Sequence, residues 1–292
     1  MIVVEVENIL RSALAIAGPG RAGRALACSW ISAGGGVREV LGRDLASAAR
    51  FAFEIGQGRP QSISDASFDC DLLVLAVPDD AIESAAGQLA GRVSCRVAFH
   101  LSGARSADLL SPFRKYGAAA GSLHPLKAFH GGAEESWRGV FVAVEGDPLA
   151  VDAGLRVALA LGAHGREIAP EGKALYHAAA TLAAGGCLAL VSLAVRIWTS
   201  LGLPENEARA ALAGLGSQAL ASLEQRGFEE AFTGPIARRD VGTVRDHAAA
   251  LAAFPEIALV YGLLARETLD RTPGRGQDER IRAALAAGEP KA

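Results

Sequence analysis

The chain has 292 residues and half of them are hydrophobic, so it is long enough for one large or two ordinary domains with a sizeable core. Its formal net charge of −3 provides no basic excess, which argues against a nucleic-acid surface held by phosphate contacts. The four cysteines lie far apart in the sequence, which argues against a disulfide framework or a zinc site and favours a reducing, cytoplasmic environment. The acidic first ten residues are not typical of a secretory signal.

Strand-like and helical segments alternate over the first 169 residues. Residues 2–6 form either an extra edge strand or a loosely held arm. Short apolar runs predict strands at 13–17, 37–42, 72–77, 96–100, 118–123, 140–145 and 165–168. Helical patterns predict helices at 24–33, from 45 onward, at 81–90 and at 149–161. This alternation predicts an α/β domain with a doubly wound parallel sheet over residues 1–169.

The second part of the chain, residues 170–292, reads as all-helical. Helices are predicted at 171–201, 204–227, 243–253 and 255–269, with a Gly/Pro/Arg loop at 232–240. The longest apolar stretch, 178–195, has the length of a membrane span. Because no other segment resembles a span, we expect a buried helix of a soluble bundle and no membrane contact.

The first predicted strand runs into a glycine turn. Gly18, Gly20 and Gly23 have the G-x-G-x-x-G spacing, and a helix follows. Gly18 permits the tight turn, Gly20 lets a pyrophosphate approach the backbone, and Gly23 lets the helix pack on the strand. With Pro19, Arg21 and Ala22, these residues predict a dinucleotide phosphate site of the Rossmann type at the start of a helix. An ordinary glycine-rich turn without a ligand is the alternative.

The residues that follow the second and third long strands extend this site. Arg43 follows the second strand, where an arginine suits the 2′-phosphate of NADP and an acid suits NAD. We therefore favour NADP, with NAD as the other possibility and a solvated Arg43 as the alternative. Val77 and Pro78 are expected beside the cofactor. Asp44 and Asp79 are expected to cap the helices that follow them.

Polar residues also end the next two strands. His100 and Ser102 follow one strand and His124 follows the next. Carboxyl ends of parallel strands share one sheet edge, so these side chains are expected to border a substrate cleft. A histidine there is suited to orient a carbonyl or carry a proton, although a single strand-end histidine is most often structural.

The helical part supplies further candidates. Lys173 and His177 are four residues apart on one predicted helix face, where they could exchange a proton with substrate. A lysine in a first helical turn is more often only a solvated charge. Arg238 and Arg239 could clamp a substrate anion, or form part of a surface loop. Thr243, followed by Asp246, is expected to cap a helix, and no metal-ligand spacing is found in the sequence.

Several motifs together resemble a known family. They are GPGRAG (18–23), LGR (41–43), LAVPDDAI (75–82), HLSGA (100–104), SLHPLKAF (122–129), YHAAA (176–180) and TGPIARRD (233–240). This series resembles bacterial Rossmann-like proteins that carry the domain of unknown function 2520. Such proteins are similar in build to pyrroline-carboxylate reductase, ketopantoate reductase and β-hydroxyacid dehydrogenases.

The resemblance implies an NADP-binding domain followed by an all-helical domain, similar to the C-terminal domain of 6-phosphogluconate dehydrogenase, that often dimerises. It further implies an NADP-dependent oxidoreductase acting on a small carbonyl, imine or hydroxy-acid substrate, of which a ketopantoate-reductase-like enzyme is one version. The family pattern puts the catalytic pair on Lys173 and His177, and a substrate anion on Arg238. Gly185 and Arg239 depart from that pattern in the presumed cleft, so a catalytically silent dinucleotide sensor or scaffold is the alternative.

Overall fold

The computed structural model describes residues 8–130, 135–272 and 278–286. The chain divides into two compact units, residues 1–184 and 185–292. The sequence-based boundary at residue 169 stays a prediction; residues 170–184, which it assigns to the second domain, belong to the first compact unit. The predicted edge strand at 2–6 lies outside the described residues.

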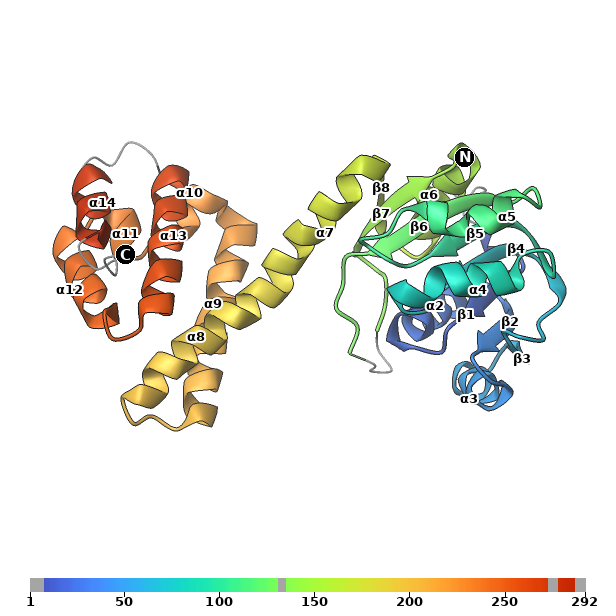
Figure 1. The fold of residues 1–292 in the computed structure, drawn as a ribbon, viewed down its shortest axis with the longest axis horizontal. Helices are drawn as coiled ribbons and strands as arrows, with labels where there is room; N and C mark the ends of the chain where they lie inside the picture. Colours follow the sequence, from blue (N-terminus) through green and yellow to red (C-terminus); the bar gives the residue numbers. More distant parts are fainter. Residues whose placement is uncertain (1–7, 131–134, 273–277, 287–292) are drawn as a thin grey trace. The chain divides into compact units, whose positions relative to one another are not determined.

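The first unit is built on one eight-stranded sheet with the order β3-β2-β1-β4-β5-β6-β7-β8 (Figure 1). Neighbouring strands pair in parallel except β6 and β7, which are antiparallel. The predicted doubly wound α/β sheet is therefore confirmed, but its last two strands, β7 and β8, run opposite to the other six. The strands are β1 (Leu14–Ala17), β2 (Val37–Gly42), β3 (Arg59–Ser62), β4 (Phe68–Leu75), β5 (Val93–His100), β6 (Ala119–Pro125), β7 (Phe141–Gly146) and β8 (His164–Glu167).

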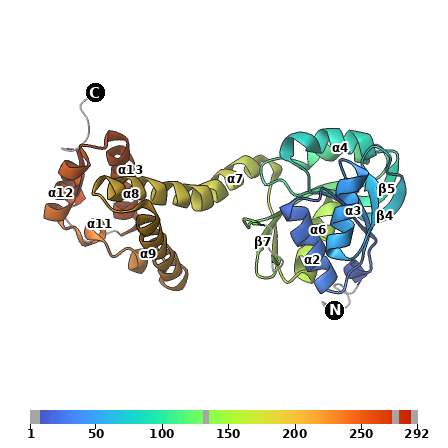
Figure 2. The same cartoon turned by 90° about the horizontal axis from the view of Figure 1, so that it is seen from below.

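Helices cover both faces of this sheet, as Figure 2 shows. The helices α2 and α6 pack on one face, and the helix α4 packs on the other. The helical segments of this unit are α2 (Arg21–Ser32), α3 (Leu45–Ile55), η1 (Asp79–Ala81), α4 (Ile82–Leu89), η2 (Ala107–Leu110), α5 (Ser111–Arg114), α6 (Pro148–Ala160), η3 (Pro170–Gly172) and α7 (Lys173–Thr181).

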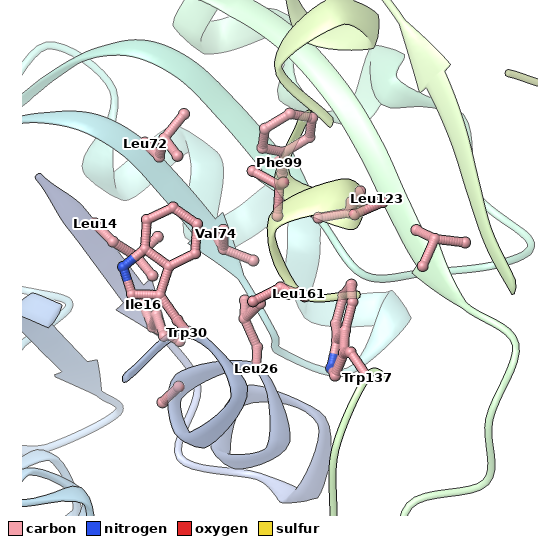
Figure 3. Packing of buried hydrophobic residues seen from close by; sticks show 14 of the residues in the cluster. Leu14, Ile16, Leu26, Trp30, Leu72, Val74, Phe99, Leu123, Trp137 and Leu161 are labelled. Atoms are coloured by element: carbon pink, nitrogen blue, oxygen red, sulfur yellow. The ribbon is translucent and has the colours of Figure 1, made fainter. Parts of the chain in front are cut away.

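The core on the α2 and α6 side is built around two tryptophans. Trp30 of α2 and Trp137 of the loop before β7 are fully buried (Figure 3). They pack in one cluster with Leu26, Phe99 and Leu123. Side chains of this size remove large apolar areas from water, and this clamps α2, which follows the glycine turn, onto the strands.

Strand β3 has no apolar run and was not predicted. Its Arg59 and Gln61 hydrogen-bond the buried Glu39 of β2, with Nε–Oε2 and Nε2–Oε2 distances of 3.1 and 2.7 Å. Pro60 is tolerated because β3 lies at the sheet edge, where one side makes no ladder bonds.

The second unit is helical, as predicted. Its segments are α8 (Cys187–Ser200), α9 (Glu205–Arg226), α10 (Phe228–Ala231), α11 (Pro235–Arg238), α12 (Val241–Leu251), α13 (Pro255–Arg271) and α14 (Asp278–Ala286). Its buried cluster joins α11, α12, α13 and α14. The predicted cap of α12 at Thr243 is wrong, because Asp240 is the N-cap and accepts a hydrogen bond from the Thr243 amide, at 3.1 Å.

One helix, Pro170–Ser200, is long and apolar enough to cross a membrane. It contains a π-helical turn, Leu182–Gly186, between α7 and α8. None of its most apolar window is buried, so the prediction that 178–195 is a buried helix is wrong for the described chain. The physical reason is that α8 has α9 as its main packing partner, which leaves Leu188 of α8 about three-quarters exposed.

Candidate functional site

The glycine turn opens onto a pocket of about 430 Å³ in the first unit, here called the glycine-turn pocket. It lies at the carboxyl ends of β1, β2 and β4, where the strand order reverses and nucleotides bind in sheets of this kind. Six of the predicted cofactor residues line it: Gly18, Pro19, Gly20, Arg43, Val77 and Pro78. The remaining lining residues are Ser47, Ile63, Ser64, Ala76, Ala81, Ser84, Ala85 and Gln88.

The three glycines of the turn have different physical roles. Gly18 has φ +110°, and a Cβ there would collide with the Ala76 carbonyl oxygen. A Cβ on Gly23 would collide with the Gly18 carbonyl, so Gly23 lets α2 pack against the turn. Gly20 faces open space, with no atom within 4 Å of its Cβ position. Its backbone is accessible from the pocket, as close approach of a pyrophosphate requires.

The start of α2 adds polar donors to this pocket. The helix begins at Arg21 with Gly20 as its N-cap, and no side chain caps it. The amides of Arg21, Ala22 and Gly23 therefore lie in an uncapped first turn, with the positive end of the helix dipole. Together with the open space at Gly20, this arrangement fits a dinucleotide phosphate group.

Arg43 is the exposed basic residue at the rim, directly after β2. The neighbouring Asp44 caps α3 as predicted: its carboxylate accepts from the Ser47 amide at 2.8 Å, which lowers its pKa. The carboxylate of Asp44 is thus engaged by its own helix, whereas Arg43 faces the pocket.

A second group of polar residues lies side by side across the neighbouring strands β5, β6 and β7, here called the polar row. His100 pairs with Ser122, and Ser122 pairs with Glu145, so their side chains share one face of the sheet. All three residues are buried. The antiparallel register of β7 against β6 brings Glu145 opposite Ser122. The Glu145 carboxylate accepts from the Ala107 amide at 3.0 Å.

Lys173, in the first turn of α7, contacts Ser122 and Glu145 of this row, and its side chain is only 2% exposed. Its Nζ donates to the Ser102 carbonyl at 3.2 Å and to the Ser122 hydroxyl, and it lies 3.7 Å from Glu145 Oε2. Burial lowers the pKa of Lys173, while Glu145 and Asp79 oppose that shift. The expectation of a solvated lysine is wrong, because the amine is enclosed by oxygen atoms of the sheet.

His100 connects this row to the loop that follows β5. Its Nδ1 accepts from the Ser102 amide at 3.2 Å, so the neutral ring carries its proton on Nε2 and donates to the Ser106 carbonyl, 3.1 Å away. Burial lowers the pKa of His100 to about 4. At neutral pH the ring is therefore uncharged, and its two hydrogen bonds hold the loop from Ser102 to Ser106 against β5.

Ser102 joins the buried cluster to the pocket. Its hydroxyl donates to Asp79 at 2.8 Å and accepts from the Arg105 amide at 3.1 Å. Asp79 follows Pro78, which lines the glycine-turn pocket. The prediction that Asp79 caps the next helix is wrong, because η1 has Pro78 as its N-cap and no side-chain cap.

His124, Tyr176 and His177 form the outer part of the cluster and are partly exposed. His124 Nδ1 lies 3.0 Å from the Tyr176 hydroxyl, and the two rings meet edge to face. The His124 and His177 ring centroids are 5.7 Å apart. Burial, followed by the positive potential of His177 and Lys173, lowers the pKa of His124 to about 4.

Gly103 allows this crowding of rings. A Cβ on Gly103 would lie 2.7 Å from both His124 Nε2 and His177 Nδ1. His177 Nδ1 is buried and, among the described residues, has no hydrogen-bond partner. The two imidazoles therefore converge on a backbone position where no side chain fits.

The structure thus brings together His100, Ser102, His124, Lys173 and His177, all of which were predicted from the sequence. Arg238 lies in the second unit, where its guanidinium donates to the Thr233 carbonyl. Gly185 lies in the exposed π-helical turn.

Arg239, which the sequence offered with Arg238 as a clamp for a substrate anion, is buried inside the second unit and bonded there. It has φ +56° at the end of α11, a conformation that favours glycine. Its buried guanidinium bonds Asp278 at 2.7 Å and both the hydroxyl and the carbonyl of Thr272. Inside the second unit it therefore ties α11 to α13 and α14.

Sequence reasoning missed Glu145, Ser122, Tyr176 and the role of Asp79. Glu145 ends a predicted strand, and the same edge argument that was applied to His100 and His124 could have drawn attention to it. Tyr176 lies inside the YHAAA motif and carried no separate signal.

The acid sensitivity of the fold follows from His100 and His124. Their pKa values are lowered from 6.5 to about 4, so the unfolded chain binds more protons between these limits. Stability is therefore present above pH 6.5 and is lost as the pH falls towards 4. We expect the free energy of unfolding in urea to fall steadily between about pH 6 and 5.

His100→Asn keeps an acceptor near Nδ1 and removes the titrating ring. It should reduce this slope by about one proton, roughly 1.4 kcal/mol per pH unit. Exposed His164→Asn is the matched control and should keep the wild-type slope. An unchanged slope in His100→Asn would contradict a neutral, buried His100.

Two family models match the chain: a Rossmann-like domain over residues 6–125 and the domain of unknown function DUF2520 over residues 140–268. No curated protein matches the sequence significantly.

Many solved structures share the fold. Protein TM1727 from Thermotoga maritima is 22% identical with a TM-score of 0.71, covering 94% of this chain and 100% of that chain. The putative NADP oxidoreductase BF3122 from Bacteroides fragilis is 17% identical with a TM-score of 0.70, covering 89% and 98%. A reductive aminase from Aspergillus terreus, in complex with NADPH and ethyl-5-oxohexanoate, is 19% identical with a TM-score of 0.60, covering 95% and 99%. The first part of the chain thus matches the model of a Rossmann-like domain and the second part that of DUF2520.

Proposed function

We propose that the protein is an NADP-dependent oxidoreductase that acts on a small carbonyl, imine or hydroxy-acid substrate. One observation carries this proposal: a glycine-turn pocket and a buried polar cluster at the same sheet are joined by the hydrogen bond from Ser102 to Asp79. A phosphate-binding turn next to groups that hold protons is what a nicotinamide reaction needs.

The cofactor assignment follows from the lining of the pocket. The accessible backbone at Gly20 and the uncapped start of α2 would hold the pyrophosphate, and Arg43 would pair with the 2′-phosphate. Similar folds in complex with NADPH or NADP⁺, such as the reductive aminase and an imine reductase from Myxococcus stipitatus, support this assignment. When bound, the nicotinamide supplies or takes a hydride.

The polar cluster would provide the proton chemistry. His124, Tyr176 and His177 are partly exposed and can face a substrate heteroatom. Lys173, Glu145 and Ser122 are buried behind them and fix the start of α7. From the sequence alone we also propose Arg238, in the second unit, as an anion-binding residue. A ketopantoate-reductase-like reaction is one version of this chemistry.

The first test is cofactor binding by Arg43→Glu. Loss of a charge-assisted contact costs about 1.5–3 kcal/mol, so NADPH affinity should fall roughly 10- to 100-fold while NADH affinity changes much less. Fluorescence titration of both cofactors measures this change. Exposed Arg50→Glu in α3 makes the same charge change outside the pocket lining and should keep the wild-type preference.

The outcomes separate the candidate functions. If the unaltered protein binds neither NADPH nor NADH, the proposal fails. If it binds NADPH but reduces none of 1-pyrroline, cyclohexanone and pyruvate, the second candidate, a silent dinucleotide sensor or scaffold, gains support. If Arg43→Glu retains the preference for NADPH, Arg43 does not bind the 2′-phosphate.

We further propose that the protein is a cytoplasmic homodimer in which a second copy covers the apolar surface of α8 and α9. Leu188 of α8 and Leu215 and Leu220 of α9 are more than half exposed in the single chain. Exposed apolar surface of this kind is costly in water, and the run from Cys187 to Val195 contains no charged residue. A like surface from a second copy would be self-complementary.

Sedimentation velocity tests this assembly. The molecular mass obtained for the unaltered protein should be twice the chain mass of 30.0 kDa. The mass obtained for Leu188→Glu should be lower and approach that of a single chain. Leu45→Glu, at another leucine that is more than half exposed, in α3 of the first unit, is the control and should remain dimeric. A monomer at micromolar concentration, or flotation with lipid vesicles, would contradict the dimer.

A further inference from the structure

We propose that Tyr176, hydrogen-bonded to His124, is the residue that gives the proton to the substrate heteroatom, and that Lys173 is a positioning residue. This inference rests on the proposed oxidoreductase function and names the acid of that reaction. It changes the assignment that the sequence favours, in which Lys173 and His177 exchange the proton.

The surroundings of Lys173 argue against direct proton transfer from its amine. An ammonium group has three donors, and three oxygen atoms surround this one: the Ser102 carbonyl, the Ser122 hydroxyl and Glu145 Oε2. Lys173 is 2% exposed and Glu145 is 3% exposed. Delivering a proton outward would leave the Glu145 carboxylate buried without its charge partner, which is expensive.

Tyr176 is placed three residues later on the same helix, where α7 is partly exposed. Its hydroxyl lies 3.0 Å from His124 Nδ1, and its ring also packs against Phe141 at a centroid distance of 6.4 Å. The hydroxyl is thus held by the sheet while the helix presents the residue at its surface. Burial raises the pKa of Tyr176, which keeps the phenol protonated at neutral pH.

His124 is arranged to restore the proton. Its Nδ1–H can donate to the tyrosine oxygen, and Nε2 lies at the Gly103 position beside His177. The groups that face the ring are His177 and Tyr176 from α7, Lys173 below them, and Asp79 and His100 from neighbouring loops and strands. The low pKa of His124 leaves a neutral imidazole with one donor and one acceptor.

The proton sequence balances without further co-reactants. With hydride added to the substrate carbon, the π electrons of the C=O or C=N bond move to the heteroatom. The Tyr176 O–H bond breaks and its proton bonds to that heteroatom, which gives an alcohol or an amine. The phenolate takes the proton from His124 Nδ1 as Nε2 takes one from solvent, so that one solvent proton is consumed per turnover. Release of the Nε2 proton to solvent and uptake of one at Nδ1 then restore the starting tautomer of His124.

The chain offers a matched control in its second unit. Tyr261 and His247 repeat the same contact, with 2.9 Å between the hydroxyl and Nδ1 and 5.8 Å between ring centroids. Tyr176→Phe and Tyr261→Phe therefore delete the same hydroxyl from the same kind of pair. We expect Tyr176→Phe to lower kcat about 10²- to 10⁴-fold on any probe that the unaltered protein reduces, with NADPH affinity unchanged. Tyr261→Phe should keep its rate.

A readout independent of turnover is the ring protonation of His124, measured by ¹⁵N NMR of the full-length protein at neutral pH. We expect a proton on Nδ1 and none on Nε2, with a shift of the Nδ1 resonance in Tyr176→Phe and not in Tyr261→Phe. A proton on Nε2 alone would mean that the tyrosine hydroxyl donates to the ring, and would overturn the proposal.

The two proposals fail in different ways. If NADPH binds and a probe is reduced, but Tyr176→Phe keeps its kcat, Tyr176 is not the acid while the oxidoreductase function stands. If the unaltered protein binds no NADPH, both fall together. If NADPH binds without reduction of the probes, the tautomer of His124 decides the assignment of Tyr176.

Discussion

The ion pair between Lys173 and Glu145 is the interaction on which the candidate site depends. Both side chains are almost fully buried, and their charged atoms lie 3.7 Å apart. Burying one such charge alone costs several kcal/mol, so each requires the other, together with the hydrogen bonds to Ser102, Ser122 and Ala107. The pair therefore fixes the start of α7 against β6 and β7, and with it the positions of Tyr176 and His177.

This anchor is continuous with the cofactor pocket through ordinary hydrogen bonds. Lys173 bonds the Ser102 carbonyl, the Ser102 hydroxyl bonds Asp79, and Asp79 follows the pocket residue Pro78. His100 braces the same loop through the Ser102 amide and the Ser106 carbonyl. Groups held this way lose little freedom when a ligand binds, which is the physical basis of preorganisation in active sites.

The sequence predicted those parts of the site that depend on local pattern. Apolar runs located most of the strands, and because parallel strands end at one edge, His100 and His124 could be expected near each other. The glycine spacing located the pocket. Arg59–Ser62 has no apolar run, and its pairing depends on the distant Glu39, so local pattern could not reveal β3.

Features set by long-range pairing were beyond that reasoning. The register of β7 against β6 pairs Glu145 with Ser122, and no local signal encodes that pairing. The burial of Lys173 also depends on long-range contacts, with Ser102, Ser122 and Glu145. From local sequence alone, a lysine in the first turn of a helix is expected to be solvated. Arg239 differed for a third reason: its position requires a left-handed backbone, and its side chain is bound by Thr272, more than thirty residues away.

The most direct test of this account is a double-mutant cycle on Lys173 and Glu145, measured as the free energy of unfolding in urea. Lys173→Met and Glu145→Gln should each cost about 3–5 kcal/mol, because each leaves a buried charge without its partner. The double variant should cost much less than the sum of the two. Additive losses, or a Lys173→Met variant as stable as the unaltered protein, would contradict a site anchored by this pair.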